Sequence, residues 1–412
     1  MLVYRRHSMN TVVVLVFAFV YLGMVLGEIP GLALDRTGIA LLGALALVAT
    51  EQVTPAAAWN AVDVPTLALL FGLMVVSAQF RLGGFYASVT QRVVASSVAP
   101  PVLLALLIGT VGLLSAVLAN DIVCLAVAPL LVAGCAKKGL DPVPFLLALA
   151  CAANVGSAAT LIGNPQNMLI GQRLKLSFAG YMLDALLPSV LGLGVVWAVV
   201  SVRFNRRWHQ PTPIADVAAP AFDGFQTGKA IVILTLLVAG FLFLPTRREV
   251  LALTAAGLLL TSRRMASRDL LNLVDWHLLV LFVGLFVVNF AIADAGTLAQ
   301  AEAALHRLGV DLGRPAILFP VTVVLSNLVS NVPAVILLLP QATHLQAGPI
   351  LALASTLAGN LFIVGSIANI IVVEQAAKLG VRIGWREHAR VGVPVTVATL
   401  AIAALWIALR SV

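Results

Sequence analysis

Charge is scarce in this sequence. Only 10% of its 412 residues are Asp, Glu, Lys or Arg, against about 25% in soluble domains. With 61% hydrophobic residues and a mean hydropathy of +1.06, the chain has too little polar surface to coat a soluble particle. The scarcity excludes a soluble enzyme, a nucleic-acid-binding protein and a disordered scaffold. We therefore predict an all-α polytopic membrane protein that lies in a lipid bilayer.

Cysteine is scarce as well, and its three copies fall inside apolar segments. Cys124, Cys135 and Cys151 are too few for a disulfide framework. Buried cysteine is more often a small packing residue than a ligand for a soft ion. No zinc-ligand spacing, Walker A loop or ATPase signature occurs. We expect no catalytic residue, no metal site, no bound cofactor and no ATP-driven transport by this chain itself.

Long apolar runs, by contrast, are numerous. Eight have an ordinary length for a spanning helix; they lie at 11–27, 36–50, 64–80, 183–202, 229–245, 248–262, 277–293 and 391–409. No small-residue cleavage site follows the first run, so we interpret it as a span rather than a signal peptide. Four further apolar stretches are interrupted by polar or Gly-containing segments: 101–136, 144–172, 315–342 and 349–379.

The interruptions recur in the two halves of the chain. An offset of 211 relates Asn120 and Pro129 to Asn331 and Pro340. An offset of 212 relates Asn60-Ala-Val-Asp63 to Asn272-Leu-Val-Asp275, Gly72 to Gly284 and Gly84 to Gly296. An offset of 202 relates Gly163-Asn164-Pro-Gln-Asn167 to Gly365-Ser366-Ile-Ala-Asn369. Matches in the same order predict two homologous halves, 1–208 and 209–412.

Each half is predicted to contain five spans, one of them broken, and a re-entrant hairpin. This gives about ten transmembrane helices and two hairpins. Because five is odd, the two repeats have inverted topology. On alternating sides, 16 of the 25 Lys and Arg fall on one side and 9 on the other. The richer side is predicted to be cytoplasmic, with both termini outside the plasma (inner) membrane and residues 203–228 as the cytoplasmic linker.

The hairpin tips and helix interruptions bring unpaired backbone groups to membrane depth, where inverted-repeat proteins can build a substrate site. Asn120 and Asn331 stand at the tips, and their amides can both donate and accept hydrogen bonds. We predict that they bind substrate; capping of their own helices is the alternative. The other predicted substrate-binding residues lie at the interruptions and beside the second tip: Gly163, Asn164, Asn167, Gly365, Ser366, Asn369 and Ser330.

Asp121 is the only acid in the middle of an apolar segment. A carboxylate at membrane depth is costly and takes up a proton more readily than one in water, so Asp121 is the predicted proton-coupling residue. The alternative is an ionised N-cap of the second hairpin arm. Its repeat counterpart is Val332, so the two tips differ chemically. Asp63 and Asp275, at matching span entrances, are predicted to cap helices.

These motifs resemble the ion transporter superfamily over essentially the whole chain. The resemblance rests on Ala119-Asn120-Asp121 with Pro129, on the Gly163–Asn167 segment and on Ser330-Asn331-Val-Pro-Ala. The superfamily includes arsenite efflux pumps, sodium/proton antiporters and divalent anion/sodium symporters. The Asn-Asp pair resembles the arsenite pumps, whereas the anion symporters usually show Ser-Asn-Thr at both tips. The resemblance implies an elevator-like motion of hairpin-bearing units against a dimer-forming scaffold.

We therefore expect a secondary transporter that exports arsenite or antimonite in exchange for protons. The alternatives are a sodium- or proton-coupled permease for inorganic or organic anions and a sodium/proton antiporter. The coupling ion is accordingly expected to be a proton, with sodium as the alternative. A homodimer and a soluble ATPase partner stay open, and no nucleic-acid partner is expected.

Overall fold

The computed structural model describes residues 2–29, 31–205, 207–209, 220–262 and 265–410. These residues form helices joined by turns and loops, and they contain two isolated β-bridges but no strand. Within this part of the chain, seven helices are long and apolar enough to cross a membrane, and six shorter apolar helices accompany them. The predicted all-α architecture is confirmed.

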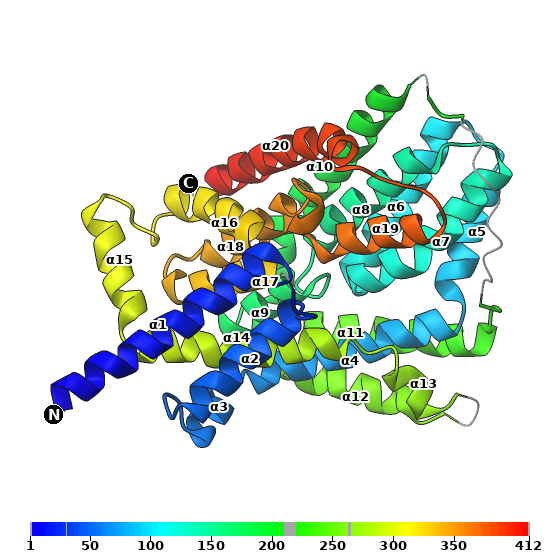
Figure 1. Cartoon of the computed structure of the whole chain (residues 1–412). Coiled ribbons are helices and arrows are strands. Elements are labelled where there is room, and N and C mark those ends of the chain that lie inside the picture. The colour runs from blue at the N-terminus through cyan, green and yellow to red at the C-terminus, as the bar shows by residue number, and fades with distance from the viewer. Residues whose placement is uncertain (1, 30, 206, 210–219, 263–264, 411–412) are drawn as a thin grey trace.

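The helices pack in two layers, which occupy roughly the lower and upper parts of Figure 1. The first layer contains α1 (Leu2–Leu26), α2 (Arg36–Ala49), α3 (Pro55–Ala61), α4 (Val64–Leu82), α11 (Gly224–Phe243), α12 (Arg248–Leu260), α13 (Ser267–Leu271) and α14 (Trp276–Asp294). The second contains α6 (Pro100–Val117), α7 (Asn120–Lys137), α8 (Pro142–Ser157), α9 (Pro165–Arg173), α10 (Phe178–Phe204), α16 (Pro315–Val329), α17 (Asn331–Leu338), α18 (Ala347–Ala358), α19 (Ile367–Lys378), α20 (Trp385–Arg410) and the 3-10 turns Leu339–Gln341 and Ile363–Gly365. The layers are joined at opposite ends of the molecule by α5 (Phe85–Ala95) and α15 (Thr297–Arg307).

Two glycines mark equivalent helix crossings in the first layer. A Cβ on Gly72 in α4 would lie 2.6 Å from the carbonyl carbon of Ala252 in α12, and one on Gly284 in α14 would lie 2.7 Å from that of Ala40 in α2. Gly284 lies 212 positions after Gly72, and Ala252 lies 212 positions after Ala40, so the two crossings are related by the offset of the repeat. Each crossing therefore uses one helix from each half, and the close backbone approach requires glycine.

Helices α4 and α14 also begin alike. Their N-cap residues Asp63 and Asp275 have backbone angles of φ −79°, ψ 82° and φ −78°, ψ 82°. Each carboxylate accepts a hydrogen bond from a first-turn N–H, of Thr66 at 3.0 Å and of Leu278 at 2.9 Å. The predicted capping by these two acids is confirmed.

The second layer contains the hairpins and the interrupted helices. Helices α6 and α7 turn at Leu118 and Ala119, and α16 and α17 turn at Ser330. Ser330 has φ 75° and ψ 161°, a region that normally only glycine occupies. The chain is non-helical between α8 and α9 and mostly so between α18 and α19. Entry and exit of each hairpin on one side of a membrane stays a prediction.

The predicted linker, 203–228, is too long at both ends, because α10 continues to Phe204 and α11 already begins at Gly224. Part of it lies outside the described residues, including Arg206, Pro211 and Pro213. Arg263 and Arg264, which contribute to the predicted loop charges, also lie outside that part.

Candidate functional site

Both hairpin tips and both helix interruptions meet at one small cavity. Six of the ten predicted site residues line it: Asn120, Asp121, Asn164, Ser330, Asn331 and Ser366. The remaining lining residues are Asn154, Pro165, Gln166, Val332 and Ile367. The cavity volume is about 20 Å³, enough for one water-sized molecule. The fold therefore brings side chains from the two halves of the chain to a single site.

The two interruptions are connected to each other by matching hydrogen bonds. Asn164 Nδ2 donates to Thr356 Oγ1 at 3.3 Å, and Ser366 Oγ donates to Asn154 Oδ1 at 2.8 Å. Ser366 and Thr356 lie 202 positions after Asn164 and Asn154. Each interruption thus bonds to the helix that precedes the interruption of the other half, which holds both in one unit.

Asn167 and Asn369 do not line the cavity in this structure. Asn167 Nδ2 donates to Thr160 O at 3.0 Å and to Ser157 O at 3.4 Å. Asn369 Nδ2 donates to the equivalent carbonyls, Phe362 O at 3.1 Å and Gly359 O at 2.8 Å. These amides donate to carbonyls at the ends of the interrupted helices, of which Phe362 O also accepts from the N–H of Gly365 at 3.1 Å. Their role here is to brace the interruptions, and their contact with a substrate stays a prediction.

Gly163 and Gly365 connect the interruptions to the hairpin tips. The N–H of Asn120 donates to Gly163 O at 3.3 Å. The Asn331 amide orientation that satisfies both its ends places Nδ2 3.2 Å from Gly365 O. A Cβ on Gly163 would lie 2.3 Å from Ser157 O, so the backbone packs too closely there for any other residue. Tip and interruption are therefore joined within each half.

Among the residues that the structure describes, Asp121 is the only charged one that lines the cavity. Among the described residues its carboxylate has no hydrogen-bond or ion-pair partner, and no side chain caps α7, whose N-cap is Ala119. The alternative in which Asp121 caps its own helix therefore finds no support. Asp275 lines a neighbouring cavity together with Asp121, so an acid of the first layer approaches the site.

Several residues that bind the interrupted segments from neighbouring helices were not in the predicted set. Tyr181 Oη donates to Ala158 O at 2.8 Å and accepts from Asn167 Nδ2 at 3.1 Å. His388 Nε2 lies 3.0 Å from Asn360 O, the carbonyl that matches Ala158 in the second half. The offset of 202 could have identified Thr356 from Asn154, but no sequence signal marks Tyr181 or His388, which come from different positions on α10 and α20.

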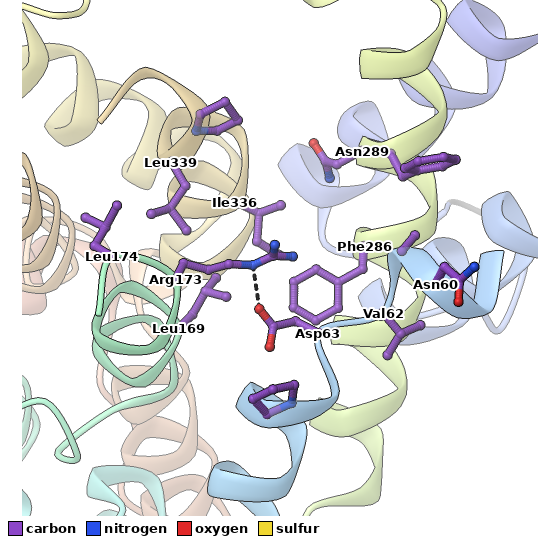
Figure 2. A pocket seen from close by; sticks show the side chains of 14 residues that line it. Asn60, Val62, Asp63, Leu169, Arg173, Leu174, Phe286, Asn289, Ile336 and Leu339 are labelled. Carbon is purple, nitrogen blue, oxygen red and sulfur yellow. Dashed lines mark ion pairs between the residues drawn. The ribbon is translucent and has the colours of Figure 1, made fainter. Parts of the chain in front are cut away.

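A larger crevice lies between the layers, at the C-terminal end of α9 (Figure 2). Its volume is about 690 Å³, and α4, α9, α14 and α17 contribute to its walls. Arg173 Nε lies 2.5 Å from Asp63 Oδ2. The Arg173 guanidinium also lies 5.6 Å from the centre of the Phe286 ring. One ion pair thus bridges the two layers across the crevice.

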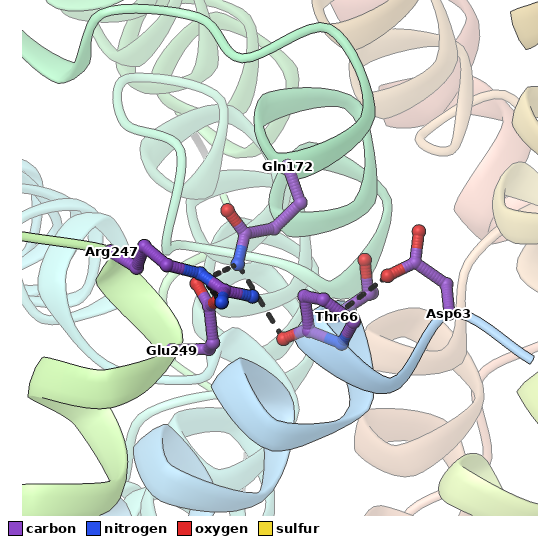
Figure 3. A network of polar contacts seen from close by, with 6 residues as sticks. Asp63, Thr66, Gln172, Arg247 and Glu249 are labelled. Atoms are coloured by element: carbon purple, nitrogen blue, oxygen red, sulfur yellow. Dashed lines mark hydrogen bonds and ion pairs between the residues drawn. The ribbon is translucent and has the colours of Figure 1, made fainter.

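Further polar contacts fasten the same end of α9 to the first layer (Figure 3). Gln172 Nε2 donates to Glu249 Oε2 at 3.0 Å, and Arg247 Nε lies 2.6 Å from Glu249 Oε1. Arg248 donates to Gly171 O at 3.3 Å and also to Leu176 O. We call Asp63, Gln172, Arg173, Arg248 and Glu249 the α9 clamp.

Comparison with known proteins gives a family and a fold. The family CitMHS, described as citrate transporter, matches residues 21–350. A 46 kDa membrane protein of Mycobacterium leprae is 28% identical, over 98% of this chain and 99% of its own. The silicon efflux transporter LSI3 of Oryza sativa subsp. japonica is 27% identical over 94% and 95% of the two chains. The putative transporter arsB of Dictyostelium discoideum is 22% identical over 90% and 87%.

Among solved structures, the crystal structure of the Alcanivorax borkumensis YdaH transporter, reported to have an unusual topology, is similar. The TM-score is 0.56 and the sequence identity 15%, over 98% of both chains. At this identity the likeness concerns the fold alone. Together with the apolar helices, the matches make this chain a multi-pass membrane protein.

Proposed function

The chain belongs to the CitMHS family of secondary transporters, and we propose that it exports arsenite or antimonite in exchange for protons. The observation that carries the proposal is the lining of the cavity between the hairpin tips. Amides and hydroxyls dominate its polar groups, and no Lys, Arg or His in the described part of the chain lines it. Such a lining suits a small uncharged solute that carries hydroxyl groups.

Trihydroxy arsenic(III) is largely uncharged near pH 7, and it both donates and accepts hydrogen bonds. The amides of Asn120 and Asn331 approach the cavity from opposite halves, so each can bind one hydroxyl. The names of two relatives, a silicon efflux transporter and a putative transporter arsB, support export of a hydroxylated metalloid. A cavity of about 20 Å³ must widen to admit such a solute.

Proton coupling is assigned to Asp121. Its carboxylate lines the cavity and has no partner among the described residues, so it can gain and lose a proton without breaking a contact. A proton taken up outside would be released to the cytoplasm as the unit returns, and export of substrate would use the proton gradient.

The motion is proposed to be an elevator-like slide of the second layer against the first. The hydrogen bonds that join tips and interruptions support movement of the second layer as one body. The site adjoins a cavity of about 150 Å³ at the N-terminal ends of α2 and α14. By the loop charges this end is cytoplasmic, so the conformation is assigned to the inward-facing state of a transporter in the plasma membrane.

A sodium- or proton-coupled anion permease is the second candidate, because the family is described as citrate transporter. An anion would lie beside the Asp121 carboxylate, and no described residue places a cationic side chain in the cavity. It would therefore need a bound cation, and sodium is the obvious one. Dependence of uptake on sodium separates this candidate from the first.

The test is expression in an arsenite-sensitive bacterial host that lacks its own exporter. The proposal predicts increased resistance to arsenite and antimonite, and loss of that resistance when an uncoupler collapses the proton gradient. Asp121→Asn should abolish export from everted vesicles at equal protein level. Full export by Asp121→Asn would refute the coupling role, and sodium-dependent citrate uptake without arsenite resistance would favour the second candidate.

A further inference from the structure

The C-terminal end of α9 is fastened to the first layer, and the inverted repeat predicts a counterpart of this clamp in the second half. The offset of 212 holds for the first layer, where α2 and α12 begin at Arg36 and Arg248. The offset of 202 holds for the broken helices, where Asn167 and Asn369 make equivalent contacts. The counterparts of Asp63, Gln172, Arg173, Arg248 and Glu249 are therefore Asp275, Glu374, Gln375, Arg36 and Thr37.

In this structure the counterparts on the first layer, Arg36, Thr37 and Asp275, do not contact the counterparts on α19, Glu374 and Gln375. Asp275, Arg36 and Thr37 line a cavity with Ile367, the first residue of α19. Arg36 Nε donates to Met24 O at 3.2 Å. Glu374, near the other end of α19, is exposed and has no ion pair among the described residues. The second clamp is thus present as a set of residues but is not assembled.

The two halves differ by a shift along the broken helices. Asp63 meets Arg173 at the C-terminal end of α9, whereas Asp275 lies near Ile367 at the N-terminal end of α19. The counterpart of Arg173 is Gln375, eight positions beyond Ile367, which corresponds to about 12 Å along an α-helix. Because inverted repeats run α9 and α19 in opposite directions, one translation of the second layer opens the first clamp and closes the second.

We propose that Glu374 pairs with Arg36, and Gln375 donates to Asp275, in the opposite state of the transport cycle. This second clamp would replace the α9 clamp at the other face of the membrane. The inference rests on the elevator motion proposed above. It assigns to Glu374 and Arg36 a positioning role that neither residue has in the present conformation.

The repeat alone does not fix the charges of the clamp residues. In each clamp, nevertheless, the charges on the broken helix and on the first layer attract or are neutral to each other. Where α9 carries the neutral Gln172, the first layer offers the carboxylate of Glu249 as acceptor. Where α19 carries Glu374, the first layer has Thr37 in place of that carboxylate, next to the guanidinium of Arg36. A carboxylate at position 37 would repel Glu374 on closure, and the sequence avoids it.

Paired cysteines test the proposal in membranes, on a chain whose Cys124, Cys135 and Cys151 are replaced by alanine. One variant carries Asp63→Cys with Arg173→Cys, and the other carries Arg36→Cys with Glu374→Cys. We expect a bifunctional thiol reagent with a reducible spacer, which spans the gap that the shortened side chains leave, to cross-link both pairs. Transport should stop on cross-linking and return on reduction. The matching single-cysteine variants should not cross-link within the chain. Cross-linking of the first pair without the second, in membranes where the parent transports, would overturn the proposal.

Variants that change the charge at position 374 test the ion pair by a second measurement, the rate of cross-linking. In the Asp63→Cys/Arg173→Cys background, Glu374→Gln should favour the present state and speed cross-linking by about 1.4- to 5-fold, the range for a solvent-exposed ion pair worth about 0.2–1 kcal/mol. Arg382→Gln, at an exposed position shortly after the end of α19, is the matched control and should change nothing. Combining Arg36→Glu with Glu374→Arg should restore the parent rate. An unchanged rate in Glu374→Gln contradicts the ion pair.

Cross-linking requires no substrate, so the inference and the proposed function can fail separately. If both pairs cross-link but arsenite is not exported, the motion and the second clamp stand and only the substrate is wrong. If arsenite export is proton-coupled but the second pair never cross-links, the function stands and the second clamp is wrong.

Discussion

Asn369 repeats the backbone contacts of Asn167 at a separation of 202 residues. Each amide donates to the carbonyl seven positions before it, at 3.1 and 3.0 Å, and to the carbonyl ten positions before it, at 2.8 and 3.4 Å. The two interruptions are therefore built to one plan, in which an asparagine replaces the missing helical hydrogen bonds. The structural predictions below follow from this plan and from the packing around it.

Asn167→Ala should lower the thermal stability of the purified protein. The substitution removes the donor to Thr160 O inside the second layer, and a buried carbonyl without a partner costs about 1–3 kcal/mol. Thermal unfolding in detergent measures the effect. Asn205→Ala, at an exposed position after α10, is the control and should leave the midpoint unchanged. Equal midpoints for the two variants would argue against the bracing role.

Gly72→Ala should destabilise the crossing of α4 and α12. The new Cβ would lie 2.6 Å from a backbone carbon of Ala252, which cannot move like a side chain, and overpacking typically costs about 1–3 kcal/mol. Gly257→Ala, in α12, has open space around the new Cβ and should be neutral or stabilising. Midpoints of thermal unfolding compare the two variants. An unchanged midpoint for Gly72→Ala would mean that α4 and α12 can separate enough to admit the methyl group.

Ser330→Gly should stabilise the second hairpin tip. The backbone angles φ 75° and ψ 161° cost a residue with a Cβ about 1–3 kcal/mol, and glycine avoids this cost. Ser330→Ala keeps the strain and removes the hydroxyl from the cavity. We expect a higher unfolding midpoint for Ser330→Gly than for Ser330→Ala, and weaker substrate transport in both. If the alanine variant is the more stable of the two, the strain is not present in solution.

Asp121→Asn should leave the stability of the fold unchanged. The carboxylate has no partner among the described residues, and the amide is nearly the same size, so no folded-state contact is lost. Asp63→Asn is the matched comparison and should lower the unfolding midpoint, because it weakens the pairing with Arg173 across the layers. A large loss of stability in Asp121→Asn would indicate a structural carboxylate rather than a coupling group.

Much of the fold could be predicted because the repeat is visible in the residues that interrupt the apolar runs. The eight ordinary spans fall on α1, α2, α4, α10, α11, α12, α14 and α20. The meeting of Asn120 with Asn331, and of Asn164 with Ser366, also follows from matched interruptions. The bracing role of Asn167 could not be predicted, because an amide at an interruption can face the substrate or the backbone, and only the local geometry selects between them.

Asp63 illustrates a second limit of prediction from the sequence. Its position predicts an N-cap, which the structure confirms, but not its pairing with Arg173 from the other layer. That contact joins residues 110 positions apart on helices that belong to different layers. A periodicity within one helix carries no information about which part of another layer it faces.

The sequence by itself determined that this chain is an all-α membrane protein, because scarce charge and long apolar runs leave no other way to satisfy its backbone, and it predicted two related halves. It also marked the tips and interruptions, because polar residues at membrane depth are costly and recur. Only the tertiary structure decided which amides face the cavity, and which residues of the first layer contact the C-terminal end of α9. A repeated sequence permits an amide to face either the cavity or the backbone, and the packing of the surrounding helices selects one orientation.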